Sequence, residues 1–269
     1  MSVGSSLELL AVSELDFCVV DTETTGGKAE NEHVIDIAAF HYRDGIIFDK
    51  FQTLINPGKA IPSWITQLTG ISNEMVTNAP TFSEIAIPLA EFLNKGVFVA
   101  HNAAFDYSFI KSEYARVGMG WERPKLCTVR MARHLYPELP SRSLGALCDY
   151  LMIDLTDRHR AHGDAEATVY VLKHLLKKAE REMGVSNWKS LQILMQGETL
   201  VLPKGISTDF ILGLPKEKGS YLFKDEKGEI VFHGQTINLQ KRLYNLFRKS
   251  NQSKRSQRFR ENVRAIELI

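Results

Sequence analysis

The sequence of 269 residues predicts an α/β domain with a mixed sheet flanked by helices, followed by a small α+β module. Apolar, strand-like segments dominate the first third of the chain, and helical patterns follow them. Residues 201–215 then contain two prolines and two glycines, a composition typical of a linker, and a hairpin pattern comes after them. We therefore expect a first domain over residues 1–185, a linker over 186–215 and a second module over 216–269.

The strands of the first domain are predicted from short apolar segments rich in β-branched residues. Residues 15–21, LDFCVVD, are expected to form a buried strand. Residues 33–43 and 45–55 are expected to form two more strands on either side of the turn Arg43-Asp44-Gly45. A short apolar strand is expected at residues 97–100.

The helices are predicted from cap residues and from apolar residues at helical spacing. In the first domain they are expected at residues 81–93 and 103–117, and from about residues 129, 143 and 163 onward. In the second module we expect a hairpin of residues 220–224 and 229–233, and a helix over 239–248.

The composition is that of a folded globular protein. With 44% hydrophobic and 24% charged residues, it excludes wholesale disorder, collagen-like repeats and a coiled-coil rod. The three cysteines are widely spaced and form no C-x-x-C pair, which argues against a disulfide framework and a cysteine zinc site. No apolar run approaches the ~20 residues of a membrane span, and the N-terminus lacks a signal-peptide pattern. We expect a cytoplasmic protein with no membrane partner.

The net charge of +1 conceals two oppositely charged parts. Residues 1–185 contain 18 basic and 24 acidic side chains, whereas residues 186–269 contain 15 basic and eight acidic ones. Residues 241–264 alone hold nine basic residues and one acidic residue. This asymmetry indicates a polyanionic partner, although a solvated basic tail would have the same composition.

Four acidic residues stand at the ends of predicted core elements. Asp21 and Glu23 end the first strand, and the period of two places both on one face. Asp106 and Asp164 lie near the starts of two helices, where a single acid would ordinarily stabilise the helix dipole. Two acids at a strand end can also simply face solvent. Together, however, the four carboxylates predict a site for two hard divalent cations, Mg²⁺ or Mn²⁺, which suit phosphoryl displacement.

Three segments resemble the motifs of the DnaQ-like, DEDDh-type 3′→5′ exonucleases, namely VVDTETTG, AHNAAFDYSFI and HRAHGDAEAT. The segment INPGKAIPSWITQLTGIS is also similar to this family, and the resemblance covers about residues 15–180. It implies a ribonuclease-H-like fold. It implies that Asp21, Glu23, Asp106 and Asp164 bind metal, that His159 is the general base, and that Thr24, Gly26, His101, Asn102 and Phe105 bind substrate.

The residues alone leave the general base open between His159 and His162. Both precede Asp164 on the same loop, and a neutral imidazole near pH 7 suits the abstraction of a proton from water. The spacing of the family, five residues before the aspartate, selects His159 and leaves His162 a structural or solvent-facing role. The roles of His101 and Asn102 are also open, because these residues could brace the strand end instead of contacting substrate.

Residues 214–247 resemble the start of a GIY-YIG nuclease domain, most closely the N-terminal module of UvrC-type repair nucleases. The resemblance places Tyr221 on the first family tyrosine and Arg242 on the catalytic arginine. Phe232 replaces the second tyrosine, and no glutamate fits the expected metal-binding position. We expect a non-catalytic module that serves as a DNA-binding or docking element, with candidate nucleic-acid-binding residues Tyr221, Lys241, Arg242 and Arg248.

These observations predict a metal-dependent 3′→5′ exonuclease that hydrolyses terminal phosphodiester bonds of DNA in proofreading or repair. The expected partners are DNA and a polymerase or repair complex. An RNA exonuclease and a nucleic-acid-binding adaptor with secondary nuclease activity are the alternatives, and an active GIY-YIG endonuclease is a weaker one.

Overall fold

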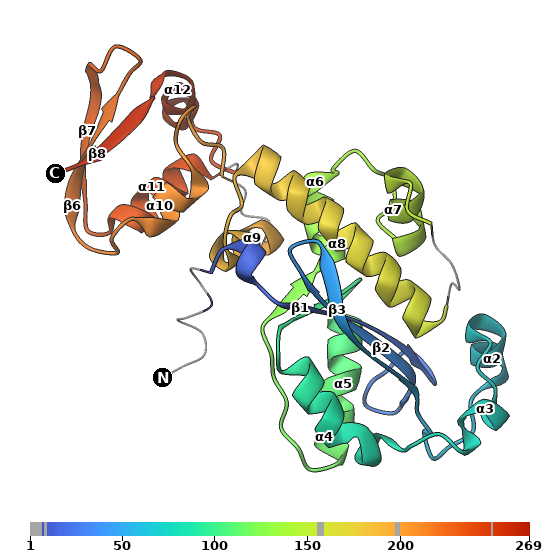
Figure 1. The fold of residues 1–269 in the computed structure, drawn as a ribbon. Coiled ribbons are helices and arrows are strands. Elements are labelled where there is room, and N and C mark those ends of the chain that lie inside the picture. Colours follow the sequence, from blue (N-terminus) through green and yellow to red (C-terminus); the bar gives the residue numbers. More distant parts are fainter. Residues whose placement is uncertain (1–6, 8–9, 155–158, 197–199, 249) are drawn as a thin grey trace. The chain divides into compact units, whose positions relative to one another are not determined.

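The computed structural model describes residues 7, 10–154, 159–196, 200–248 and 250–269. The chain divides into two compact units, coloured by sequence in Figure 1. The large unit is Ser13–Lys177, and the C-terminal unit joins Lys178–Ile269 to Met1–Val12.

The large unit is built on a five-stranded sheet with the order β3-β2-β1-β4-β5. Strand β2 is antiparallel to both of its neighbours, β1 and β3, whereas β4 runs parallel to β1 and β5 runs parallel to β4. The predicted mixed sheet is therefore confirmed. Its strands are β1 (Phe17–Thr24), β2 (Val34–Arg43), β3 (Ile46–Leu54), β4 (Val97–Ala100) and β5 (Lys125–Cys127).

The central strand β1 divides its side chains between the two faces of the sheet. Cys18 and Val20 belong to the apolar core formed with helices α4 and α5. Strand alternation turns Asp21 and Glu23 toward the other face, which α8 covers. The apolar residues thus fix the strand, and the strand places both acids on the face of α8. These helices are α4 (Phe82–Leu93), α5 (Ala104–Arg116) and α8 (Ala161–Met183).

The helices begin where cap residues and strand ends predict them. Thr81 and Glu84 form a capping box at the start of α4. Helix α5 follows β4 almost directly, through a left-handed Asn102 with φ of 71°. The helices expected from about residues 129, 143 and 163 begin within two residues of those positions. The remaining helices of the large unit are α2 (Ser63–Thr69), α3 (Asn73–Thr77), α6 (Thr128–Leu135) and α7 (Leu144–Leu151), and a 3₁₀ turn, η1 (Val12–Glu14), starts at its boundary.

The C-terminal unit contains a three-stranded antiparallel sheet with the order β7-β6-β8. Its core consists of Tyr221 and Phe223 from β6, packed against Leu243, Phe247 and Phe259 from two helices. No helix in the described part of the chain is both long and apolar enough to cross a membrane. The elements are α9 (Trp188–Gln196), α10 (Thr208–Gly213), β6 (Gly219–Lys224), β7 (Ile230–Thr236), α11 (Leu239–Phe247), α12 (Lys254–Asn262) and β8 (Ala265–Leu268).

The segment 186–215, expected to be a linker, carries the helices α9 and α10. Lys189 Nζ donates to the carbonyl of Leu212 at 3.0 Å, and Asn187 Nδ2 donates to Asp209 Oδ1 at 2.8 Å. Pro203 and Gly205 lie between these short helices, so the composition resembles that of a linker although tertiary contacts hold the two helices together.

Candidate active site

Three of the four predicted metal-binding carboxylates meet at the end of β1. Oxygen atoms of Asp21, Glu23 and Asp164 all lie within 4.8 Å of one another. The first two come from one strand, and Asp164 comes from the first turn of α8. Like-charged groups brought this close repel each other, so the arrangement favours a cation among them.

Asp106, the fourth predicted ligand, lies beside this group but outside it. It is 3% exposed in the first turn of α5. Its Oδ1 accepts hydrogen bonds from the backbone N–H of Thr22, at 3.0 Å, and from Thr22 Oγ1, at 2.9 Å. Thr22 stands between Asp21 and Glu23, so the residue separating the two strand acids holds the helix acid next to them.

The electrostatics of the site disfavour four ionised carboxylates. Burial, followed by the negative charges of Asp106, Glu23 and Asp164, raises the pKa of Asp21 well above its ordinary value. Burial and neighbouring carboxylates raise the pKa of Glu23 to about 8. Burial raises the pKa of Asp106 to about 7 although the bonds from Thr22 oppose the shift. Four oxygen-donating acids that need positive charge fit Mg²⁺ or Mn²⁺.

His159 lies at the opening of α8 with an exposed side chain and a left-handed φ of 60°. Its backbone N–H donates to Asp164 Oδ2 at 3.2 Å. His162 is placed differently, since its ring packs edge-on against Phe40 with centroids 5.2 Å apart. The structure therefore couples His159 to a site carboxylate and packs His162 against the sheet.

A further carboxylate lies under this corner of the site. Asp36 on β2 pairs in register with Glu23, and its Oδ2 lies 3.3 Å from Arg160 Nε. Burial raises the pKa of Asp36, while Arg160 and the backbone N–H groups of Ala161 and Ile37 oppose the shift. The sequence analysis did not single out Asp36 or Arg160, because an acid in the middle of a strand has no local pattern that reveals its partner.

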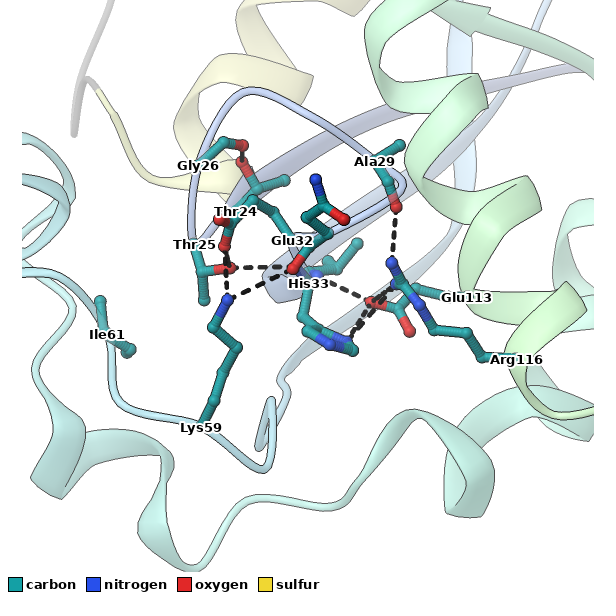
Figure 2. Close-up of polar contacts among 12 residues, drawn as sticks. Thr24, Thr25, Gly26, Ala29, Glu32, His33, Lys59, Ile61, Glu113 and Arg116 are labelled. Atoms are coloured by element: carbon teal, nitrogen blue, oxygen red, sulfur yellow. Dashed lines mark hydrogen bonds and ion pairs between the residues drawn. The ribbon is translucent and has the colours of Figure 1, made fainter.

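The predicted substrate residues Thr24 and Gly26 lie at the end of β1 and in the loop that follows it. Thr24 Oγ1 donates to the carbonyl of Gly26 at 2.7 Å. A Cβ at Gly26 would lie 2.9 Å from Glu32 Cγ, so any larger residue here would require the side chain of Glu32 to shift. Glu32 Oε2 in turn accepts from Thr25 Oγ1 at 2.5 Å and from Lys59 Nζ at 2.8 Å (Figure 2). Side-chain hydrogen bonds and an ion pair therefore stabilise the conformation of this loop.

A second network, also drawn in Figure 2, fastens the far end of the same loop to α5. The buried Glu113 accepts from the backbone N–H of Val34 at 3.0 Å and pairs with Arg116 and His33, each at 3.1 Å. Arg116 also donates to the carbonyl of Ala29 at 2.6 Å. Sequence reasoning missed Glu32 and Glu113, since their partners come from separate segments.

The remaining predicted substrate residues follow β4. Both ring nitrogens of His101 are engaged: Nδ1 lies 2.9 Å from Thr128 Oγ1, and Nε2 lies 2.9 Å from the carbonyl of Arg142. Burial lowers the pKa of His101 to about 4. These contacts fit the bracing alternative. Asn102 is exposed, and the partly buried Phe105 ring packs against Phe109 with centroids 4.8 Å apart.

The candidate residues of the C-terminal unit differ in exposure. Tyr221 is 1% exposed in the core, and Arg242 Nε donates to its hydroxyl at 3.4 Å. Lys241 is exposed at the start of α11, whereas Arg248 is partly buried at its end. Only part of the predicted nucleic-acid-binding set therefore lies on the surface.

The comparison with protein families decides the assignment of the large unit. The model of an exonuclease family, RNase_T, matches residues 18–172, which is more than half of the chain. The chain belongs to this exonuclease family. A UvrC-like GIY-YIG domain model matches residues 217–269. Both resemblances found in the sequence are confirmed, and the exonuclease fold with its carboxylate cluster suggests the use of divalent metal.

Relatives and solved structures agree with this assignment. A PolC-type DNA polymerase III of Clostridium perfringens is 41% identical over 65% of this chain and 12% of its own length. A Mycobacterium tuberculosis protein, provisionally named a bifunctional exonuclease/endonuclease, is 34% identical over 91% of this chain and 39% of its own length. This exonuclease therefore spans well under half the length of these curated relatives.

Exonuclease X, solved with 5′-overhanging duplex DNA, shares the fold at a TM-score of 0.52 and 24% identity. The match covers 66% of this exonuclease and 99% of that chain. Escherichia coli exonuclease I, solved with a dT13 oligonucleotide, matches at a TM-score of 0.58 and 15% identity over 78% of this chain and 49% of its own. These likenesses support the ribonuclease-H-like fold.

Proposed function

We propose that this chain is a metal-dependent 3′→5′ exonuclease that hydrolyses terminal phosphodiester bonds of DNA in proofreading or repair. The observation that carries the proposal is the convergence of Asp21, Glu23 and Asp164, from two elements, within 4.8 Å. Thr22 holds Asp106 beside them. Such a group of acids destabilises the fold unless a ligand neutralises it.

Asp21, Glu23, Asp106 and Asp164 would hold two divalent cations, Mg²⁺ or Mn²⁺. When bound, the cations would activate water and stabilise the negative charge that develops on the phosphate during displacement. His159 would accept the proton of the attacking water, because it is exposed at the edge of the site and attached to Asp164 through its backbone. Thr24, Gly26, Asn102 and Phe105 would orient the terminal nucleotide, with His101 bracing Asn102.

The C-terminal unit would bind nucleic acid without cutting it. Its family tyrosine position carries Phe232, which has no hydroxyl, and the guanidinium of Arg255 lies over this ring at 4.4 Å. The hollow beside it, of about 930 Å³, is lined by Lys254, Arg255 and Arg258 of α12 and also by the acidic residues Asp225, Glu226 and Glu261. None of these three basic residues forms an ion pair with a described residue. We therefore propose that α12, together with Lys241, Arg242 and Arg248, binds the phosphate backbone of the nucleic acid.

The name of the PolC-type relatives supports a DNA substrate and a partnership with a polymerase. We place the exonuclease domain at residues 1–185 and the non-catalytic module at 216–269. We also place the protein in the cytoplasm, in keeping with three widely spaced cysteines that form no C-x-x-C pair.

The experiment uses the full chain and oligonucleotides labelled at either end, as single strand, duplex, mismatched duplex and matched RNA. We expect single nucleotides to be released from the 3′ end of DNA with Mg²⁺ or Mn²⁺, and no release with EDTA. Faster digestion of RNA would replace the DNA assignment, and release from the 5′ end would refute the polarity. Nicks in a circular duplex that persist in the Asp21→Asn variant would show an active GIY-YIG endonuclease.

A further inference from the structure

Arg160, the residue that follows His159, forms an ion pair with the buried Asp36 of β2. Asp36 is 1% exposed on β2, and its Oδ2 lies 3.3 Å from Arg160 Nε. Asp36 faces Glu23 across the strand pair, so both carboxylates point to the face covered by α8. Arg160 is the residue between His159 and the first residue of α8.

Stability alone does not explain this pair. Removing a carboxylate from water costs several kcal/mol, and replacing a buried ion pair by apolar residues is often neutral or stabilising. At this position the charge of Asp36 also adds to the repulsion at Glu23. The pair therefore works against the local electrostatics of the site, which favours a role in specifying geometry.

The backbone around Arg160 needs such a constraint. His159 adopts a left-handed φ of 60°, a conformation that is unfavourable for a residue with a side chain. Such conformations persist only where the surroundings impose them. Two contacts do so here: the His159 N–H donates to Asp164 Oδ2 at 3.2 Å, and the carbonyl of Arg160 accepts from the backbone N–H of Asp164 at 3.1 Å.

The side chain of Arg160 supplies the third constraint. While its guanidinium is held by Asp36 on the sheet, the peptide units on both sides of Arg160 have a fixed direction. His159, on the outer side of this anchor, then has its imidazole exposed at the edge of the carboxylate group. Without the anchor, the turn would lose this side-chain link to β2 and keep its two contacts with Asp164.

We propose that Asp36 and Arg160 are positioning residues for His159. This inference rests on the proposed function, because it assigns the pair to the proton-accepting histidine. The pair acts through the orientation of the imidazole and contacts neither the cations nor the substrate. The competing role is a direct contact of Arg160, whose side chain is 35% exposed, with a substrate phosphate.

The test is a double-mutant cycle in the full chain. Arg160→Gln and Asp36→Asn are each measured alone and with His159→Ala, for kcat and KM on 3′-labelled single-stranded DNA. We expect each single change to lower kcat about 10- to 100-fold, since small misplacements of a reacting group cost this much. KM should stay within about twofold. In the His159→Ala background neither change should lower kcat further.

Two further variants bracket the cycle. Arg160→Lys keeps the charge and should retain more of kcat than Arg160→Gln. Arg133→Gln removes an equal charge from the exposed side of α6 and should leave kcat unchanged. Arg160 is partly exposed, so its variants are expected to fold. They still test the proposal if Asp36→Asn does not fold.

Two measurements do not depend on turnover. Mn²⁺ affinity, measured by calorimetry, should change less than about threefold in Arg160→Gln if the pair leaves the cations alone. With ¹³C-labelled histidine, the resonance of His159, identified by its loss in His159→Ala, should shift or broaden in Arg160→Gln while those of the other seven histidines stay in place.

Equal losses of kcat with and without His159, or a fall in Mn²⁺ affinity that matches the loss of kcat, would overturn the proposal. An unchanged His159 resonance would do the same. If the wild-type chain released no nucleotides, the proposed function would fail, while the resonance would still report whether the pair positions His159.

Discussion

The two units each gather charges of one sign, but they do so at very different energetic cost. In the large unit, carboxylates lie close together on rigid elements, and burial raises the pKa values of Asp21, Glu23 and Asp106. In the C-terminal unit, Lys254, Arg255 and Arg258 stand exposed on α12. Repulsion between charges is strong in a desolvated site and weak in water. A cluster of half-buried carboxylates therefore favours a cationic ligand, whereas a set of exposed cations indicates only the sign of a partner.

The two units also differ at the positions that correspond to catalytic residues of their families. The exonuclease site retains its acids and its histidine. In the GIY-YIG module, Tyr221 is buried, and Phe232 contributes only a ring, which Arg255 covers. The contrast can be tested by substituting one region at a time and asking whether turnover or binding changes.

The largest effect is expected from Asp21→Asn or Asp164→Asn. Each variant removes one negative charge from the cluster but keeps the shape of the side chain. Several kcal/mol of charge stabilisation are then lost in the transition state, and about 1.4 kcal/mol corresponds to a tenfold change in rate. Turnover should therefore fall about 10³-fold or more. The readout is the release of 3′ nucleotides in Mg²⁺. Asp149→Asn, on the exposed end of α7, is the matched control and should retain full turnover. Retained activity in the Asp21 or Asp164 variant would refute the assigned site.

The next effect separates the two histidines. His159→Ala should lower turnover by about 10²-fold, within the usual contribution of a general base. His162→Ala removes a ring that packs on Phe40 and should lower the melting temperature while changing turnover little. Single-turnover rates and thermal unfolding measure the two effects separately. The reverse pattern would move the proton acceptor to His162.

The third effect concerns binding by the basic unit. The triple change Lys254→Gln, Arg255→Gln and Arg258→Gln should weaken binding of single-stranded DNA and reduce the slope of log affinity against log salt by about 2, at roughly 0.7 per phosphate contact. Turnover at saturating DNA should not change. Neutralising Lys50, Lys95 and Arg133, three exposed cations of the large unit, is the matched control. An unchanged salt slope in the α12 variant would exclude this surface.

Local patterns predicted the framework of the site, since they act over a few residues. The period of a strand placed Asp21 and Glu23 on one face, and helix starts placed Asp106 and Asp164 close to their observed positions. Sequence resemblance supplied the identity of the family. What stayed hidden depends on partners far apart in the chain, such as the bonds from Thr22 to Asp106 and the pair of Asp36 with Arg160.

Composition was also misleading where tertiary contacts override it. The segment 186–215 contains the turn-forming residues of a linker, yet its two helices are held by contacts between their ends. Burial could not be predicted for Tyr221 either, because the resemblance identified its family position and not its surroundings. The sequence thus predicted candidate reacting groups, whereas the residues that support them emerged only from the structure.

The smallest expected effect concerns stability, because the clustered acids of the large unit should destabilise the fold when they are ionised without a cation. In the folded, metal-free chain the pKa of Glu23 is raised from its ordinary 4.5 to about 8, so the folded state retains a proton that the unfolded chain releases. A group with a raised folded-state pKa contributes stability below its ordinary pKa, and this contribution is lost as the pH rises toward the folded value. With EDTA, the melting temperature should therefore fall between about pH 4.5 and pH 8.

Glu23→Gln should reduce that fall and make the metal-free chain more stable than wild type at pH 8, by a few degrees at most for a chain of this size. With saturating Mn²⁺ the order should reverse, because the cation neutralises the carboxylates and its binding stabilises the wild-type fold. Glu91→Gln, an exposed acid on α4, should show neither change. No such reversal of stability with metal is expected from the exposed cations of α12. If the melting temperatures of wild type and Glu23→Gln depended equally on pH and on Mn²⁺, the carboxylate cluster would not differ energetically from the cations of α12.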